Sequence, residues 1–301
     1  MTHKIVVLGD GAWGKALAAL ATDCGHDVSM WSRRNPDSKS FKNADAIIAA
    51  IPAQSLGSVL HSLTIEPETD IIVTAKGIAR DTGQFMHEVV RESCPRNAIY
   101  ILSGPSFAED VSRKMPTALT LAGDNLNAAR QWATAFARPH FRIYASDDLA
   151  GVALGGSLKN VMAIACGISD GQRLGESARA ALIARSFSEL TRLGRALGAK
   201  SETLMGLSGL GDLLLTCSSS QSRNYAFGRR IGEGIGIAEA LATSKGVVEG
   251  VYSAKSAVAL AHKYAIEMPI ATAVSNIVEG VSSPKQEIEK LLSRPITQEF
   301  L

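Results

Sequence analysis

The sequence predicts an α/β chain in two domains, a doubly wound amino-terminal domain followed by a second, all-α domain. In the first half, short aliphatic runs alternate with segments of helical spacing, the pattern of strand–helix–strand units. After about residue 148 the segments have helical spacing and no convincing strand. A length of 301 residues also fits two domains of roughly 150 residues each. We expect these domains to span 1–148 and 149–301.

Seven segments of the first half are expected to be strands. Several are nearly continuous runs of β-branched or aliphatic residues bounded by Gly, Pro, Asp or Asn, which is typical of a parallel sheet covered by helices on both faces. Helical spacing is found between strands at 13–23 and 82–93. The expected strands are 4–8, 27–31, 46–51, 70–74, 98–102, 117–121 and 141–144.

The second half is expected to be helical, with Gly and Ser concentrated in the connections 205–211 and 217–222. The polar tail from Pro284 to Leu301 is expected to form a short final helix and a loose end. The main expected helices are 149–168, 176–198, 223–231, 236–242, 249–264 and 271–280.

Composition excludes several classes of protein. A net charge of +2 is too balanced for a nucleic-acid binder, which needs many phosphate-neutralising cations. The four cysteines lie far apart without a CxxC pair or a histidine at ligand spacing, so we expect no disulfide framework and no metal site. There is no signal-peptide core, and no uncharged apolar stretch reaches the ~18–20 residues of a membrane span. We therefore expect a cytoplasmic protein.

A glycine-rich hexapeptide follows the first expected strand. Residues 9–14 read GDGAWG, with Gly9, Gly11 and Gly14 in the spacing GxGxxG, directly before a helix. Glycines allow a tight turn and close backbone approach, and the helix N-terminus offers free N–H groups to a pyrophosphate. The context predicts a Rossmann-like dinucleotide site; the alternative is a glycine turn without a ligand.

The end of the second expected strand indicates which dinucleotide binds. An acidic residue there usually holds the ribose 2′-hydroxyl, but this sequence has Arg33 and Arg34 instead. Two guanidiniums suit a 2′-phosphate, which they can bind bidentately. NADP(H) is therefore favoured over NAD(H), with use of both left open. The alternative is a solvated arginine pair.

Ligands of open α/β sheets bind beyond the carboxyl ends of the strands. Lys76 follows the strand 70–74, and the run GPSFA, residues 104–108, follows the strand 98–102. We expect both to line the crevice of the glycine loop. A surface lysine and a plain proline turn are the alternatives.

One lysine lies in an unusual setting. Between 152 and 168 only Ser157, Lys159 and Asn160 are polar, and a helix that is apolar nearly all round is normally buried. Burial of Lys159 near another cation would lower its pKa towards neutrality, as a proton-transferring lysine requires. Most helix lysines are solvated, which is the alternative.

A buried ammonium needs a counter-charge. Asp212 is an isolated acid between a glycine-rich turn and an apolar run, and we expect it to orient Lys159; the alternative is a helix cap. Thr216, one helical turn on, is expected to face the same way. Further along, the run 218–224, SSSQSRN, precedes a helix, and a helix N-terminus beside an arginine suits a phosphate. A flexible serine loop is the alternative there.

Taken together, these residues resemble the bacterial NAD(P)-dependent glycerol-3-phosphate dehydrogenases over nearly the whole chain. The resemblance implies a dinucleotide-binding amino-terminal domain, an all-helical carboxyl-terminal domain, and reduction of dihydroxyacetone phosphate to sn-glycerol 3-phosphate for phospholipid synthesis. The blocks that carry it are VLGDGAWG, AKGI, GPSFAED, GGSLKNVMAIACGISDG, GLSGLGDLLLTC, SSSQSRNYAFGRRIGEG and VVEGVYSA.

The resemblance also implies roles for single residues. Lys159 is similar to the family's proton-transferring lysine, and Asp212 to its acidic companion. The positions that match substrate-holding residues are Lys76, Gly104, Ser106, Ser222, Arg223 and Asn224. The positions that match cofactor contacts are Ala12, Trp13, Arg33, Arg34, Lys76, Ala108, Arg223, Val247 and Glu249.

The sequence departs from the family at two places. Ala12 stands where the family often has serine, which removes one hydroxyl contact to the pyrophosphate. Only NPDSKSFKN separates Arg34 from Ala44, where relatives carry a longer loop and helical segment. The second departure adjoins the expected 2′-phosphate pocket and bears on cofactor preference.

The expected reaction is direct hydride transfer between C4 of a nicotinamide and C2 of the triose phosphate. Lys159 would stabilise and protonate the developing alkoxide, Lys76 would polarise and hold the substrate, and Arg223 would clamp its phosphate. One rival is a related dehydrogenase of β-hydroxy acids or ketoacids; another is a non-catalytic NADP(H) sensor. A homodimer is common on base rates, but the sequence does not select an oligomeric state.

Overall fold

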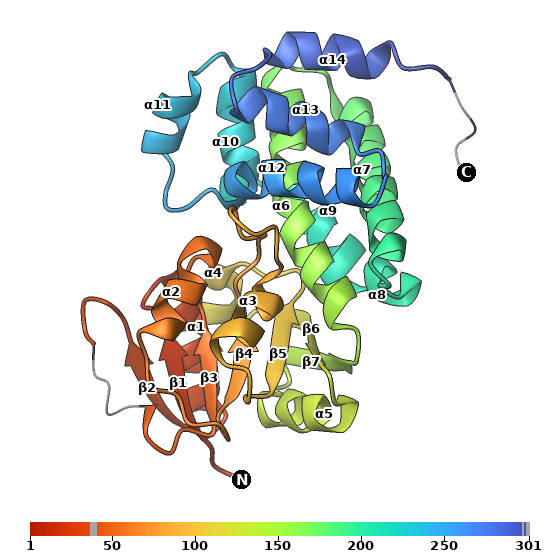
Figure 1. Cartoon of the computed structure of the whole chain (residues 1–301). Coiled ribbons are helices and arrows are strands. Elements are labelled where there is room, and N and C mark those ends of the chain that lie inside the picture. Colours follow the sequence, from red (N-terminus) through yellow and green to blue (C-terminus); the bar gives the residue numbers. More distant parts are fainter. Residues whose placement is uncertain (37–40, 297, 299–301) are drawn as a thin grey trace.

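The computed structural model describes residues 1–36, 41–296 and 298, and its first half is a seven-stranded sheet (Figure 1). The strand order is β2-β1-β3-β4-β5-β6-β7, so the chain changes direction across the sheet at β1. Every neighbouring pair is parallel except β5 and β6. The strands are β1 (Lys4–Leu8), β2 (Asp27–Trp31), β3 (Ala46–Ala49), β4 (Asp70–Val73), β5 (Ile99–Ser103), β6 (Thr117–Gly123) and β7 (Phe141–Ser146).

The sheet is covered by helices on both faces, because successive side chains of a strand point in opposite directions. In β1, Ile5 and Val7 pack on one side with α1 (Ala12–Asp23), α4 (Ala108–Ser112) and α5 (Leu126–Ala135). Val6 and Leu8 pack on the other side. The elements there are η2 (Ala53–Ser55), α2 (Leu56–His61) and α3 (Met86–Ser93). This is the doubly wound arrangement that the sequence predicts.

All seven expected strands are confirmed, but the domain differs from the prediction in the direction of one strand pair and in the helices that cover the sheet. The sheet is not parallel throughout, because β6 runs antiparallel to β5. The second difference concerns helices: of those that cover the sheet, α1 and α3 were predicted, whereas the short α2 and α4 and the longer α5 were not. The start of α5 carries a recognisable signal, since Asn125 Oδ1 accepts from the backbone N–H groups of Asn127 and Ala128 at 2.9 and 3.1 Å.

The second half is helical, as predicted, and α6 lies at its centre (Figure 1). Helices α7, α9, α10, α12 and α13 all pack against α6. The helices are α6 (Leu149–Gly171), α7 (Glu176–Ala196), α8 (Ser201–Met205), α9 (Asp212–Ser218), α10 (Arg223–Gly232), α11 (Ile237–Ala242), α12 (Glu249–Lys263), α13 (Pro269–Val278) and α14 (Pro284–Leu292).

The connection expected at 205–211 is different in the structure. Residues Leu207–Gly211 form a π-helical turn, η3, that runs directly into α9. The connection expected there is therefore helical over most of its length, and Asp212 begins α9 directly after it. The short final helix in the tail is confirmed as α14, while residues 297 and 299–301 lie outside the described part of the chain.

The length and composition of α6 would allow it to cross a membrane, but 94% of its apolar window is buried inside the protein. This is the environment of a core helix, and it explains why α6 is apolar nearly all round.

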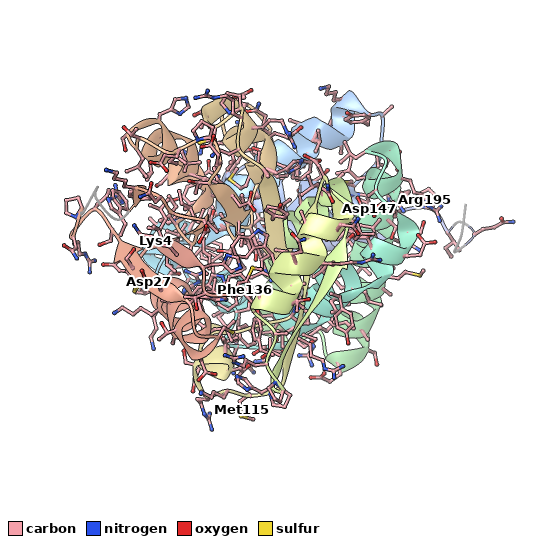
Figure 2. The ribbon with its side chains drawn as sticks, turned by 90° about the horizontal axis from the view of Figure 1, so that it is seen from below. Lys4, Asp27, Met115, Phe136, Asp147 and Arg195 are labelled. Carbon is pink, nitrogen blue, oxygen red and sulfur yellow. The ribbon has the colours of Figure 1, made fainter. Side chains whose placement is uncertain are left out.

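Figure 2 views the molecule from below, with Lys4 and Asp27 marking the starts of β1 and β2. The amino ends of these strands thus lie away from the helical half.

Candidate active site

Two lysines from different halves of the chain converge on one carboxylate at the carboxyl edge of the sheet. The Lys159 amine donates to Asp212 Oδ1, and the Lys76 amine donates to Asp212 Oδ2 at 2.7 Å. Lys76 also donates to the Gly104 carbonyl at 3.1 Å. The Asp212 side chain is 0% exposed, against 9% for Lys159 and 18% for Lys76. The cluster combines two helices of the second half, α6 with Lys159 and α9 with Asp212, with the segments that follow β4 and β5.

The environment of Lys159 suits proton transfer. Burial lowers its pKa from 10.5 to about 7, because an ammonium loses its hydration there. The Asp212 carboxylate opposes this shift and the nearby Lys76 cation reinforces it. The expectation of a buried lysine with a pKa near neutrality is confirmed. At physiological pH the amine can therefore both give up and accept a proton.

Hydrogen bonds hold this cluster in place. Thr216 faces the same way as Asp212, as expected: its Oγ1 donates to the Asp212 carbonyl at 2.6 Å and lies 3.4 Å from Oδ1. Ser157 Oγ donates to the Gly77 carbonyl at 3.0 Å. This bond fixes α6 against the residue that follows Lys76.

A chain of buried amides runs from Lys76 to α12. Asn160 Nδ2 lies 3.4 Å from the Lys76 carbonyl, and Asn160 Oδ1 accepts from Asn224 Nδ2 at 2.9 Å. Asn224 Oδ1 in turn accepts from the Gly250 N–H at 2.9 Å. Ser157 and Asn160 were not among the predicted site residues, although they are the other polar residues of the apolar run around Lys159. Their spacing could have identified them.

The predicted phosphate site lies at the start of α10. Ser222 caps this helix by accepting from the Tyr225 N–H at 3.3 Å, and Arg223 is its first residue, with an exposed side chain. Asn224 Nδ2 donates to Asn160 and its Oδ1 accepts from Gly250, which leaves the second N–H of Nδ2 and the backbone N–H for an anion. Ser106 donates to the Gly104 carbonyl at 3.3 Å, the same oxygen that Lys76 binds.

The glycine loop has the geometry that a dinucleotide needs. Gly9 has a φ of +121°, and a Cβ there would lie 2.5 Å from the Ala50 carbonyl oxygen. A Cβ on Gly14 would lie 2.1 Å from the Gly9 oxygen, so α1 approaches the loop closely. Gly11 is the N-cap, and among the described residues no side chain caps the helix and no atom lies within 4 Å of a Cβ placed on Gly11. The N–H groups beside Ala12 and Trp13 are thus available to a pyrophosphate.

The remaining predicted cofactor positions lie at the same edge. Arg33 and Arg34 are exposed directly beyond β2, and Ala108 begins α4. Val247 precedes α12, whose first residue Glu249 accepts from the Ala53 N–H at 3.1 Å. Glu249 Oε2 is buried without a hydrogen-bond partner among the described residues, and burial raises the pKa of this carboxyl. A buried carboxyl oxygen without a partner can accept a hydrogen bond from a ligand that carries an N–H donor.

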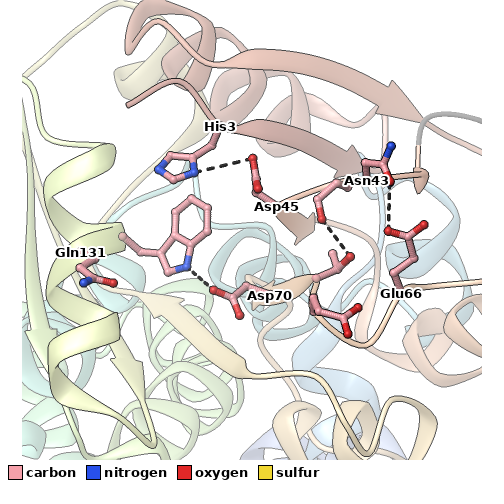
Figure 3. Close-up of a pocket in the computed structure, with 10 residues that line it drawn as sticks. His3, Asn43, Asp45, Glu66, Asp70 and Gln131 are labelled. Carbon is pink, nitrogen blue, oxygen red and sulfur yellow. Dashed lines mark hydrogen bonds and ion pairs between the residues drawn. The ribbon is translucent and has the colours of Figure 1, made fainter.

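A cavity of about 410 Å³ lies elsewhere, at the amino edge of the sheet (Figure 3). Its polar groups largely pair with one another. Trp132 Nε1 donates to Asp70 at 2.6 Å, and His3 lies 3.7 Å from Asp45. Lys159 and Asp212 do not line it. The candidate active site is the cluster of Lys76, Lys159 and Asp212 at the carboxyl edge.

A glycine loop at the switch point of a doubly wound sheet, with a buried lysine titrating near pH 7 at the same edge, defines a nicotinamide-dependent dehydrogenase. Family models agree with this class. The model described as NAD-dependent glycerol-3-phosphate dehydrogenase C-terminus matches residues 148–289, and the corresponding N-terminus model matches 4–41 and 35–129. The chain belongs to the NAD-dependent glycerol-3-phosphate dehydrogenase family.

Individual relatives are similar over almost their full length. The chain is 44% identical to a Parvibaculum lavamentivorans protein named glycerol-3-phosphate dehydrogenase (NAD(P)+), covering 99% of this chain and 98% of that protein. An Erythrobacter litoralis protein of the same name is 42% identical over the same shares of the two chains. The crystal structure of glycerol-3-phosphate dehydrogenase from Coxiella burnetii superposes with a TM-score of 0.93 at 37% identity, covering 97% of this chain and 99% of that one.

The comparisons also bear on the shortened segment after Arg34. The alignment to the P. lavamentivorans protein spans 327 positions, more than the 301 residues of this chain, so that relative has residues without a counterpart here. The N-terminal family model matches in two pieces that overlap over residues 35–41. Residues 37–40 of this segment lie outside the described part of the chain.

Proposed function

We propose that this protein reduces dihydroxyacetone phosphate to sn-glycerol 3-phosphate, reversibly and by direct hydride transfer from NADPH or NADH, as a step in glycerophospholipid synthesis. The observation that carries the proposal is the buried Lys159 amine on Asp212, with a pKa of about 7. The names of relatives at 44% and 42% identity support the substrate and the pair of cofactors.

When bound, the reduced nicotinamide supplies the hydride that C2 of the substrate accepts. Lys159 stabilises the negative charge that develops on the carbonyl oxygen and then donates the proton that this oxygen takes. In the reverse direction the neutral Lys159 amine removes the hydroxyl proton. Asp212 orients Lys159 through their hydrogen bond. Thr216, one turn further along α9, holds Asp212 in place by donating to its backbone carbonyl.

Substrate binding is divided between two ends of the crevice. Lys76, with Gly104 and Ser106 beside it, holds the carbonyl end. The exposed Arg223 guanidinium and the N–H groups at the start of α10 bind the phosphate, because Ser222 leaves part of that helix N-terminus free. Phosphate binding orients the reacting carbon through a group that does not react.

The cofactor is assigned to the glycine loop and the segments around it. Arg33 and Arg34 favour NADP(H), because guanidiniums pair with a 2′-phosphate and no acid stands at this strand end. NAD(H) is the second cofactor. The residues proposed to contact the cofactor are Gly9, Gly11, Ala12, Trp13, Gly14, Arg33, Arg34, Lys76, Ala108, Arg223, Val247 and Glu249.

The proposal extends to the organisation of the chain. A boundary between 1–148 and 149–301 is supported by β7, which ends at Ser146, and by α6, which begins at Leu149. A cytoplasmic location is supported by the four free cysteines. A homodimer is proposed on base rates, and light scattering of the purified protein tests it by its mass.

A substrate panel tests the function directly. Loss of reduced-nicotinamide absorbance is followed with dihydroxyacetone phosphate, dihydroxyacetone or a 2-ketoacid, each with NADPH and NADH. We expect turnover with the phosphorylated ketone and a higher kcat/KM for NADPH. Equal turnover of the ketoacid would identify a ketoacid dehydrogenase instead, and cofactor binding without turnover of any ketone would identify a sensor.

A further inference from the structure

The segment that carries Lys76 lies outside the helices and strands. The strand β4 ends at Val73, and Lys76 is followed by Gly77, the residue type with the greatest backbone freedom. The Lys76 amine nevertheless binds the Gly104 carbonyl at 3.1 Å and Asp212 Oδ2 at 2.7 Å. Contacts from other parts of the chain therefore have to hold the backbone of this segment.

A buried serine of α6 binds the residue directly after Lys76. Ser157 is 2% exposed, and its Oγ lies 3.0 Å from the Gly77 carbonyl oxygen and 2.8 Å from the Ala153 carbonyl oxygen. The bond to Ala153, one turn back, is local to the helix. The bond to Gly77 instead ties α6 to the segment that carries Lys76.

Two buried serines of α12 bind the next two residues. Ser253 Oγ accepts from the Ile78 N–H at 3.4 Å, and Ser256 Oγ lies 3.4 Å from the Ala79 carbonyl oxygen. Ile78 is fully buried in the apolar cluster formed mainly by the helical half. Successive peptide groups after Lys76 are thus bound from two helices of the second half. We refer to the three residues as the serine clasp: Ser157, Ser253 and Ser256.

We propose that the serine clasp positions Lys76: by binding the peptide groups that follow this lysine, it places the amine on Asp212, beside Lys159. The clasp hydroxyls bond to backbone groups, so their effect on the reaction passes through Lys76. This inference rests on the proposed role of Lys76 and adds the residues that hold it in place.

The proposal has a consequence for proton transfer. Among the described residues, the charged groups that face Lys159 are Asp212 and Lys76, and the Cys217 thiol lies near the pair. Loosening the clasp lets the Lys76 cation move away, which removes a group that lowers the pKa of Lys159. That pKa then rises, and the loss of reductase activity with increasing pH occurs at higher pH.

The test is Ser157→Ala, which removes the shortest bond of the clasp. Thr69→Val is the matched control, because Thr69 is 1% exposed and its Oγ1 donates to the Ala44 carbonyl at 2.9 Å, at the amino end of β4. In Ser157→Ala we expect kcat/KM for dihydroxyacetone phosphate to fall by roughly 10- to 100-fold, the scale of a small misplacement, with its alkaline decline at higher pH. The control should keep the wild-type kcat/KM and pH profile.

A double variant distinguishes positioning of Lys76 from a general structural role. Lys76→Met removes the group that the clasp positions, so adding Ser157→Ala should cause no further fall in kcat/KM. A role that does not involve Lys76 would lower kcat/KM in both backgrounds. A further fall as large as that of Ser157→Ala alone would overturn the inference.

A second readout does not depend on turnover. Competitive labelling with acetic anhydride, read by mass spectrometry, reports the accessibility of the Lys76 amine in the protein without ligands. We expect faster labelling of Lys76 in Ser157→Ala, because its amine leaves Asp212 more often, and unchanged labelling in Thr69→Val. Wild-type kcat/KM and Lys76 labelling in Ser157→Ala would overturn the inference.

Ser253→Ala covers a failure of Ser157→Ala to fold. It breaks the clasp at α12 and leaves the bond from Ser157 to Gly77 intact. We expect faster Lys76 labelling in this variant too, and if Ser157→Ala does not fold, wild-type labelling in Ser253→Ala overturns the inference. If Lys76→Met were itself fully active, the proposed role of Lys76 in the reaction would fail instead, and the labelling would still test the clasp.

Discussion

At the scale of single residues, the site combines two ammonium groups with one buried carboxylate. Asp212 binds both lysines, and its side chain is completely buried. Three charged groups in one low-dielectric place cannot all keep their ordinary pKa values. Lys159, the more buried lysine, has its pKa lowered to about 7, which makes it the group that exchanges a proton under physiological conditions.

The first prediction concerns the pH dependence of the reaction. Reduction needs the protonated Lys159, whose pKa is about 7, so kcat/KM for dihydroxyacetone phosphate should fall above that pH. Oxidation of glycerol 3-phosphate needs the neutral amine, so its kcat/KM should rise with pH up to the same value. Initial rates in both directions across pH 5.5–9 check this. If kcat/KM changed with pH in the same direction for reduction and for oxidation, the assignment of Lys159 as the proton donor would be contradicted.

The second prediction concerns Asp212→Asn. This change leaves the buried Lys159 and the half-buried Lys76 without their counter-charge, and removing one partner of a buried pair costs about 3–5 kcal/mol. We expect the free energy of unfolding in urea to fall by that order. Asp124→Asn is the control, because its ion pair with Arg91 is exposed and contributes at most about 1 kcal/mol. Equal losses in the two variants would show that Asp212 is not a buried counter-ion.

The third prediction concerns Arg223→Ala. Loss of a guanidinium that binds the substrate phosphate should raise KM for dihydroxyacetone phosphate by roughly 10- to 100-fold, the size of a lost charge-assisted hydrogen bond. Arg229→Ala, on the same helix but paired with Glu233, is the control and should keep the wild-type KM. Steady-state kinetics at saturating NADPH measure both. An unchanged KM in Arg223→Ala would contradict the proposal that Arg223 binds the substrate phosphate.

At the scale of elements, long periodic segments could be predicted from the sequence and short ones could not. The strands and α6, α7, α10 and α12 have enough apolar residues at regular spacing to define their type. Helices α2, α4 and α8 have five or six residues, too few to show a helical period, and such helices depend on tertiary packing. The π-helical turn η3 was mistaken for a connection because its glycines are also typical of loops.

A buried carboxyl group outside the site, that of Glu189, makes the stability of the contact between α7 and α13 depend on pH. Glu189 on α7 accepts from the Ile270 and Ala271 N–H groups at 2.7 and 3.2 Å, at the start of α13. Burial nevertheless raises its pKa from 4.5 to about 7. The folded state then binds a proton between these two pH values that the unfolded chain has lost. The contribution of Glu189 to stability therefore falls as pH rises from 4.5 to 7.

The fourth prediction follows for Glu189→Gln. The amide does not titrate, so the free energy of unfolding of the variant minus that of wild type should rise with pH. The rise is at most about 1.4 kcal/mol per pH unit between pH 4.5 and 7. Urea unfolding of both proteins at pH 5 and pH 7.5 measures it. The same difference at the two pH values would contradict the raised pKa of Glu189.

At the scale of the whole molecule, the site exists only where the two halves meet. The Lys76–Asp212 bond joins residues 136 positions apart, and the Lys159–Asp212 bond joins residues 53 apart. The individual candidates could be predicted from their surroundings: Lys159 from its apolar helix, Asp212 from its isolation, and Gly9 to Gly14 from their spacing. Their arrangement could not, because hydrophobic periodicity says nothing about which distant segments touch.

Two sets of contacts in the site could not be predicted from the sequence. Asp212 was expected to bind Lys159, but its second bond, to Lys76, was not predicted. The Asn160–Asn224–Gly250 chain joins three helices by amide groups, and no local pattern indicates such a link. Both features depend on how α6 crosses the carboxyl edge of the sheet.

The most direct test is a single-turnover measurement on Lys159→Ala. The enzyme is loaded with NADPH, mixed rapidly with saturating dihydroxyacetone phosphate, and followed by the decay of reduced-nicotinamide fluorescence. We predict that the rate falls by ~10²–10⁴-fold, the usual contribution of a general acid, while NADPH binds with wild-type affinity. A rate within a factor of two of wild type would contradict proton donation by Lys159 and with it the proposed mechanism.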